Sequence, residues 1–227
     1  LAFIALSTLA CKKDDNKTDY KFSGKYDVGG HKLYLLGYGQ NKPTVILESG
    51  IGDGGTMSGW DIVQKEVKNF AQVCLYDRAG LGKSGKGPSP RTTLQIANEL
   101  HTLLESAELT PPYILVGHSM GGLHIQTYAM LYPEDIAGMV FVDPTPKELV
   151  DTLSAEAHQN LILAGAPQGV LYETGAGLNE SIPTFKSLPS LPDVPVVVIT
   201  SSFTGEGNVD KSQWEELKGY HQNLSEE

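Results

Sequence analysis

Residues 117–122 read Gly-His-Ser-Met-Gly-Gly, and this stretch decides the fold. It follows a short apolar run at 113–116 (YILV), which predicts a buried strand. It precedes residues 123–131 (LHIQTYAML), which contain no helix breaker and predict a helix. A strand that turns straight into a helix needs a very tight bend, and glycines at 117 and 121 avoid the clash that side chains would make there. We expect this bend to lift the Ser119 hydroxyl clear of the sheet.

The helix after Ser119 would direct backbone N–H groups and its positive dipole end toward the hydroxyl. A serine between two glycines at a strand-to-helix turn is the pattern of a nucleophile elbow. The five-residue pattern alone arises by chance in about one chain in ten of this length, so the strand and helix around it carry the inference. The alternative is a structural serine in a glycine turn.

The composition of the chain is that of one globular domain. Its 227 residues fit a single sizeable core, and 40% are hydrophobic. The net charge of −10, without any block of Lys or Arg, argues against a nucleic-acid partner. The two cysteines, Cys11 and Cys74, show no spacing typical of a disulfide framework or a metal site. We expect Cys74 to be a buried thiol, and we expect no metal and no cofactor.

The first residues differ in character from the rest. An apolar stretch at 1–10 (LAFIALSTLA) ends at Cys11 and is followed by lysines and aspartates. It is too short to span a bilayer and is typical of the back half of a signal peptide. Residues 9–11 (LAC) resemble the processing site of bacterial lipoproteins, which implies a lipid on Cys11 and an exported, membrane-anchored protein in the periplasm or at the cell surface. The alternative is an ordinary secretory leader with an incidental cysteine, and in either case residues 1–22 form a leader and tether.

Beyond the tether, short strands alternate with helices. We expect strands at 25–28, 32–37, 44–48, 72–76, 113–116, 138–143 and 194–200, and helices at 60–68, 92–105, 123–131 and 214–224. This alternation predicts an α/β fold with a mostly parallel sheet and helices on both faces. Residues 145–192 are too long for a simple connection, so we interpret them as a helical cap insertion. One crossover helix with a loop is the alternative.

Two further stretches join residues 116–122 in a resemblance that covers about 23–227. Residues 47–52 (LESGIG) and 76–84 (YDRAGLGKS) stand in the order and spacing of the α/β-hydrolase fold. The resemblance implies that Ser119 is the nucleophile and that the N–H groups of Met120 and Ile51 form an oxyanion hole. Relatives carry His-Gly where this chain has Ser-Gly at 49–50, which alters how that loop is braced. Asp77 and Arg78 are expected to fix a turn.

The resemblance also implies an acid and a histidine after the serine. Asp143, which ends the 138–143 strand, is the expected acid; a capping role before Pro144 is the alternative. Glu206 is the second candidate, because the usual position after the 194–200 strand holds no aspartate.

No histidine follows a final strand, where the family places its catalytic base. The six histidines are at 31, 101, 118, 124, 158 and 221. His118 adjoins Ser119 but points elsewhere on an elbow, and His221 comes before any last strand could form. We therefore expect the catalytic histidine beyond Glu227, the last strand and helix of the fold to be missing, and the chain as given to be inactive by itself.

These features imply a serine hydrolase that cleaves a carboxylic ester or a related acyl bond through an acyl-enzyme on Ser119. The expected substrate is a small, uncharged or partly apolar ester, with membrane contact only through a lipid on Cys11. The same fold supports peptidases, thioesterases and acyltransferases, and it cannot choose between them. A non-catalytic ligand-binding module is the alternative from another class.

Overall fold

The computed structural model describes residues 20–57, 59–145 and 176–200. Within them, seven strands form one sheet in the order β1-β2-β4-β3-β5-β6-β7. The strands are β1 (Phe22–Asp27), β2 (Lys32–Tyr38), β3 (Thr44–Glu48), β4 (Gln72–Asp77), β5 (Tyr113–His118), β6 (Ile136–Val142) and β7 (Val196–Ile199). Strands β3 to β7 run parallel, whereas β2 is antiparallel to both β1 and β4. The predicted mostly parallel sheet is thus confirmed.

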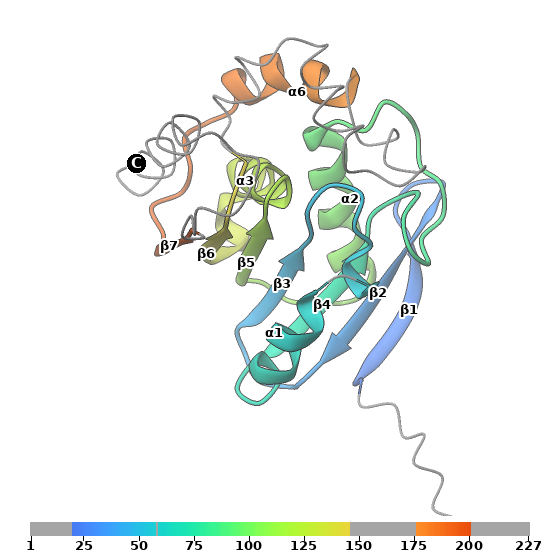
Figure 1. Cartoon of the computed structure of the whole chain (residues 1–227), viewed down its shortest axis with the longest axis vertical. Helices are drawn as coiled ribbons and strands as arrows, with labels where there is room; N and C mark the ends of the chain where they lie inside the picture. The colour runs from blue at the N-terminus through green and yellow to red at the C-terminus, as the bar shows by residue number, and fades with distance from the viewer. Residues whose placement is uncertain (1–19, 58, 146–175, 201–227) are drawn as a thin grey trace, which may run out of the picture.

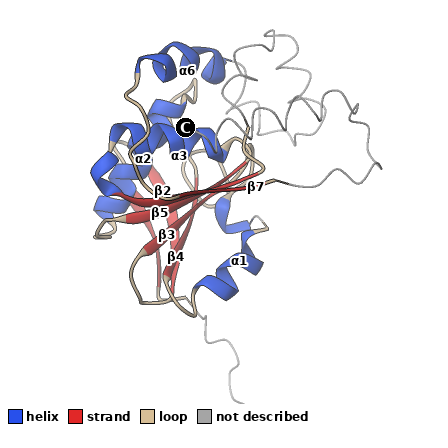
Figure 2. Cartoon of the chain, turned by 90° about the vertical axis from the view of Figure 1, so that its left-hand side faces the viewer, coloured by secondary structure: helices blue, strands red, loops and turns tan. Residues whose placement is uncertain are grey.

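Helices cover both faces of the sheet (Figure 2). Helix α1 (Trp60–Val67) lies on one face, and α2 (Thr93–Ser106) and α3 (Gly121–Leu131) lie on the other. Helix α6 (Ala176–Ser187) lies at the end of the molecule toward which β3 and β5 point (Figure 1). Two 3-10 turns, η1 (Gly55–Met57) and η2 (Pro133–Asp135), complete the described elements.

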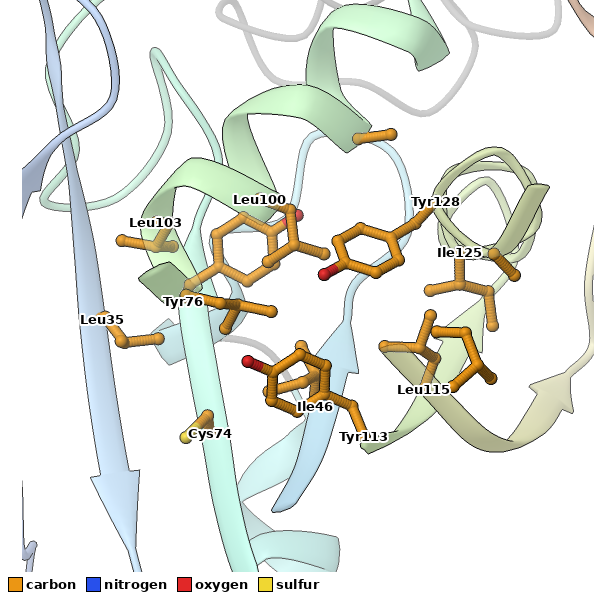
Figure 3. Packing of buried hydrophobic residues seen from close by; sticks show 14 of the residues in the cluster. Leu35, Ile46, Cys74, Tyr76, Leu100, Leu103, Tyr113, Leu115, Ile125 and Tyr128 are labelled. Atoms are coloured by element: carbon orange, nitrogen blue, oxygen red, sulfur yellow. The ribbon is translucent and has the colours of Figure 1, made fainter. Parts of the chain in front are cut away.

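The alternation of side chains along the central strands builds a core on each side of the sheet. In β3, Ile46 packs in the cluster under α2 and α3 (Figure 3), while Val45 and Leu47 pack with Trp60 of α1. Successive side chains of a strand point to opposite faces, so a strand covered on both faces buries every residue, as β3 does. Cys74 of β4 is fully buried in the first cluster, as expected, and burial raises its pKa to about 12.

Most element boundaries agree with the predicted ones. The β1–β2 hairpin turns at Gly29 and Gly30, whose φ values of 102° and 103° suit glycine, and Thr92 caps α2 by accepting a hydrogen bond from Gln95 N. The expected helix after the elbow begins earlier than predicted, at Gly121, because the turn leads into it without a linker.

Parts of the predicted cap and the predicted helix at 214–224 lie outside the described residues. Within the predicted cap, α6 is a helix that is docked on the start of α2, where Ser181 Oγ accepts a hydrogen bond from Thr93 N at 2.9 Å. No helix in the described ranges combines the length and apolar character needed to cross a bilayer.

Candidate active site

Ser119 stands at the bend between β5 and α3, in a conformation that non-glycine residues rarely adopt. Its φ is 52°, in the left-handed region. The bend brings backbone so close that a Cβ on Gly117 would lie 2.7 Å from Gly121 O. A Cβ on Gly121 would lie 2.6 Å from Glu48 O. Both glycines are therefore required by close backbone approach, as the sequence predicted.

Hydrogen bonds tie the backbone of Ser119 to its surroundings on both sides. Ser119 N donates to Val142 O at 3.1 Å, while Ser119 O accepts from Gly122 N at 2.9 Å and Thr145 N at 3.0 Å. The Ser119 hydroxyl lies 3.5 Å from the Thr145 hydroxyl. Sequence reasoning missed Thr145, although β6 pairs with β5, and residues that follow neighbouring parallel strands meet at one edge of a sheet.

The two predicted oxyanion donors flank Ser119. Met120 immediately precedes α3, and Ile51 follows Gly50, where an added Cβ would lie 3.4 Å from Ser119 Cβ. Among the described residues, neither the Ile51 N–H nor the Met120 N–H has a hydrogen-bond acceptor. Both N–H groups are therefore available to an acceptor from outside the described residues, and their role as an oxyanion hole stays a prediction.

Asp143 lies at the same edge of the sheet as Ser119. It directly follows Val142, which is paired with His118 at the end of β5. Asp143 is half-buried with a φ of 41°, and its N–H donates to Ile199 O at 2.8 Å. The structure thus places this predicted acid next to the elbow in the sheet, and its role stays a prediction. Glu206 and Cys11 lie outside the described residues.

The described histidines near the elbow have other partners. His118 presents its ring edge-on to Trp60, with ring centroids 6.4 Å apart. His124 is buried on α3, and its Nδ1 lies 3.1 Å from Glu48 Oε1. Within the described part of the chain, no histidine forms a hydrogen bond with the Ser119 hydroxyl.

A buried charge network lies beneath the loop that carries Ile51. Glu48 is fully buried, and its carboxylate accepts from Arg78 Nη1 at 2.6 Å and from the Tyr76 hydroxyl. Burial acts to raise the pKa of Glu48, but the charge of Arg78 and the contacts with His124 and Tyr76 outweigh it and lower that pKa. Because an ionised carboxylate only accepts, the Nδ1 of His124 must carry the proton of their hydrogen bond.

Sequence reasoning missed this network and the part of the Arg78 side chain in it. The Arg78 carbonyl accepts from Leu81 N at 3.0 Å in the turn after β4, as the expected turn role implies, but its guanidinium reaches back to the carbonyl oxygens of Ser49 and Gly50. The missed signal was Glu48 itself, a charged residue in a strand predicted to be buried, which needs a cationic partner.

Asp77 also fixes the turn after β4, as expected. The Asp77 carboxylate accepts from Thr56 N at 2.9 Å and from Lys83 N at 2.8 Å, and thereby joins η1 to the turn. Gly80 and Gly82, with φ values of 84° and 48°, supply the backbone angles of that turn. Asp77 is therefore occupied as a structural residue.

No group of three or more His, Cys, Asp or Glu side chains in the described ranges could hold a metal ion. The described polar groups at the elbow are the Ser119 and Thr145 hydroxyls, together with Asp143 at the end of the neighbouring strand.

Comparison with known proteins places this arrangement in context. Residues 43–187 match the family described as alpha/beta hydrolase fold. The uncharacterized protein YqjL of Bacillus subtilis (strain 168) is 29% identical over 181 residues, which are 79% of this chain and 70% of YqjL. An AB hydrolase superfamily protein of Gibberella zeae is 32% identical over 128 residues, and the match covers 55% of this chain but only 39% of that protein.

The fold also matches solved structures. E-2-(acetamidomethylene)succinate hydrolase superposes with a TM-score of 0.59 over 91% of this chain and 99% of that chain. The sequence identity is 19%, so this likeness concerns the fold.

Proposed function

Because the chain belongs to the alpha/beta hydrolase fold family, we propose that it is a serine hydrolase acting on a carboxylic ester or a related acyl bond through Ser119. The observation that carries the proposal is the left-handed Ser119 between β5 and α3, close to the loop of Gly50 and Ile51. Among the described residues, the N–H groups of Ile51 and Met120 have no acceptor.

In the proposed reaction, Ser119 Oγ attacks the carbonyl carbon of the ester and passes its proton to a general base. The two N–H groups bind the oxygen atom on which negative charge develops, and such preorganised donors each lower the barrier by ~3–4 kcal/mol. The C–O bond to the alcohol then breaks, and the alcohol leaves with the proton. Water attacks the acyl-enzyme in the same way and releases the carboxylic acid and free Ser119.

The general base of this reaction lies outside the described residues, since the Ser119 hydroxyl contacts no described histidine. Asp143 would hold that base in the correct orientation and stabilise its protonated form. Its position after β6, whose end is paired with the end of β5, supports this assignment.

A fluorophosphonate probe and p-nitrophenyl butyrate test the proposal on the protein expressed from its complete reading frame. We expect labelling and hydrolysis that Ser119→Ala abolishes. Ser106→Ala is the matched control, because Ser106 is an exposed serine at the end of α2 and should leave both signals unchanged. Hydrolysis or labelling that survives Ser119→Ala, or that is absent from the parent protein, would overturn the proposal.

A further inference from the structure

Arg78 holds two successive carbonyl groups of the loop that carries Ile51. Its Nη1 donates to Ser49 O at 2.8 Å, and its Nη2 donates to Gly50 O at 2.6 Å. Only 2% of the Arg78 side chain is exposed, and its Nη1 also donates to Glu48 Oε1 at 2.6 Å. A planar guanidinium fixed by a carboxylate offers its remaining donors in set directions, so it constrains both peptide groups at once.

Fixing the Gly50 carbonyl also fixes the Ile51 N–H, because the two groups belong to one planar trans peptide and point in opposite directions. Gly50 O accepts a second hydrogen bond from Asp53 N at 3.3 Å, which closes a turn over residues 50–53. Gly52, at the third position, has a φ of 71°, as a type II turn requires. Two donors therefore hold the carbonyl on one side and leave the Ile51 N–H on the other.

The loop also lies close against the elbow. Because Gly121 has no side chain, the carbonyl oxygens of Glu48 and Ser49 can approach α3. A Cβ added at Gly121 would lie 2.6 and 2.7 Å from these two oxygen atoms. Gly50 lies beside Ser119, as described above. The contacts with Arg78 and with the elbow together restrict rotation of the peptide between Gly50 and Ile51.

We propose that Arg78 is a positioning residue that aims the Ile51 N–H at the oxyanion formed by attack of Ser119. This inference rests on the proposed function and assigns the network of Glu48, Arg78, Tyr76 and His124 a part in it. The arginine braces the loop that departs from the His-Gly of relatives, and it does so through carbonyl groups rather than through contact with the substrate.

The experiment compares p-nitrophenyl butyrate with its thiono analogue, in which sulfur replaces the carbonyl oxygen. Sulfur accepts hydrogen bonds weakly, so the thiono ester gains little from well-aimed N–H donors. Arg78→Lys keeps the positive charge beside Glu48 but loses the planar fork that spans both carbonyls. We expect kcat for the oxygen ester to fall about 10–100-fold, KM to change little, and the thiono ester to lose at most a few-fold.

Arg91→Lys is the matched control. Arg91 is also 2% exposed and is paired with a buried glutamate, Glu99, but its contacts lie against α2 and α6. We expect this variant to keep the parent ratio of oxygen-ester to thiono-ester rates. Thermal melting by circular dichroism establishes that each variant is folded before its rates are compared.

The outcomes separate this inference from the proposed function. A parent protein without Ser119-dependent hydrolysis overturns the proposed function and the inference with it. An active parent whose Arg78→Lys variant loses rate equally on both esters, or loses none, overturns the inference alone. If Arg78→Lys fails to fold, Glu48→Gln carries the same test, because it loosens the grip on Arg78 while keeping a side chain of the same size.

Discussion

Backbone strain is concentrated where β5 and β6 end side by side. Three non-glycine residues in the described ranges have a positive φ, and two of them, Ser119 and Asp143, directly follow these paired strands. Such a conformation costs of order 1–3 kcal/mol and persists only where the surrounding structure enforces it. The third, Glu108, lies just beyond the end of α2, where left-handed residues commonly end a helix. The positive φ of Ser119 and Asp143 has no such explanation, because each residue follows a strand and neither ends a helix.

Gly117→Ala tests the tightness of the elbow. The new Cβ would meet Gly121 O at 2.7 Å and Gly122 N at 2.9 Å, so the start of α3 must shift. We expect a loss of ~1–3 kcal/mol in the free energy of unfolding and a loss of fluorophosphonate labelling. Gly59→Ala is the control, because nothing lies within 4 Å of the position of its Cβ. Urea unfolding and labelling measure both variants, and unchanged labelling of Gly117→Ala would contradict this account of the bend.

Asp143→Asn tests which carboxylate is the acid of the proposed reaction. Asparagine tolerates the positive φ of this position, so the fold should survive the change. We expect kcat on p-nitrophenyl butyrate to fall by up to about 10⁴-fold, because the base would lose its orienting carboxylate. Glu206→Gln should leave kcat within a few-fold of the parent. The reverse pattern would move the role of acid to Glu206.

At the scale of elements, a polar contact joins α6 to the start of α2. The Ser181 hydroxyl accepts from Thr93 N and donates to Gly177 O at 2.6 Å. Thr93 is buried, so its N–H depends on Ser181 for a partner. Gly177 packs directly on the Arg91 backbone, where a Cβ would overlap the carbonyl group. These contacts fix where α6 begins.

Ser181→Ala should loosen this junction. Without the Ser181 hydroxyl, the buried Thr93 N–H has no acceptor, which costs ~1–3 kcal/mol. Separation of α6 from α2 would expose this N–H to water and so recover part of that cost. We expect faster hydrogen–deuterium exchange across α6, measured by mass spectrometry of peptides from 176–187. Thr92→Ala removes the cap of α2 and should speed exchange at the start of α2 without releasing α6. Exchange of α6 at the parent rate in Ser181→Ala would show that the contact does not hold it.

The elements were largely predictable because their signals are local. The 44–48 strand is apolar and bounded by polar residues, and the elbow has glycines at the two positions where its backbone is closest. The role of Arg78 was not predictable in this way, because it bridges β4 to a loop 28 residues earlier, at Gly50. Thr145 was missed for the same reason, since its contact with Ser119 depends on strand pairing.

At the scale of the whole molecule, tyrosines contribute much of the core beneath α2 and α3. Tyr76, Tyr113 and Tyr128 are almost fully buried there (Figure 3), and burial raises the pKa of each above its ordinary value. The hydroxyl of Tyr76 donates to Glu48, and that of Tyr128 donates to Asp135 at 2.9 Å. Each folded tyrosine thus holds its proton more tightly than the unfolded chain does.

This difference predicts that the protein loses stability in alkali. The tyrosines of the unfolded chain ionise near pH 10, whereas those of the folded core stay protonated, so the unfolded state binds fewer protons above that pH. We expect the free energy of unfolding to be insensitive to these groups below about pH 10 and to fall as the pH rises further. Urea unfolding at increasing pH measures the fall, with tyrosinate absorbance as the second signal. Ionisation of all tyrosines before any loss of structure would contradict the prediction.

The backbone hydrogen bonds that join Ser119 to Val142 and Thr145 have a consequence for how relatives can diverge. An insertion or deletion between Val142 and Thr145 would pull Ser119 out of register with β6. Insertions or deletions after Thr145 leave these hydrogen bonds intact. Among homologues, we therefore expect the spacing from Val142 to Thr145 to be inherited unchanged and length variation to begin only after it.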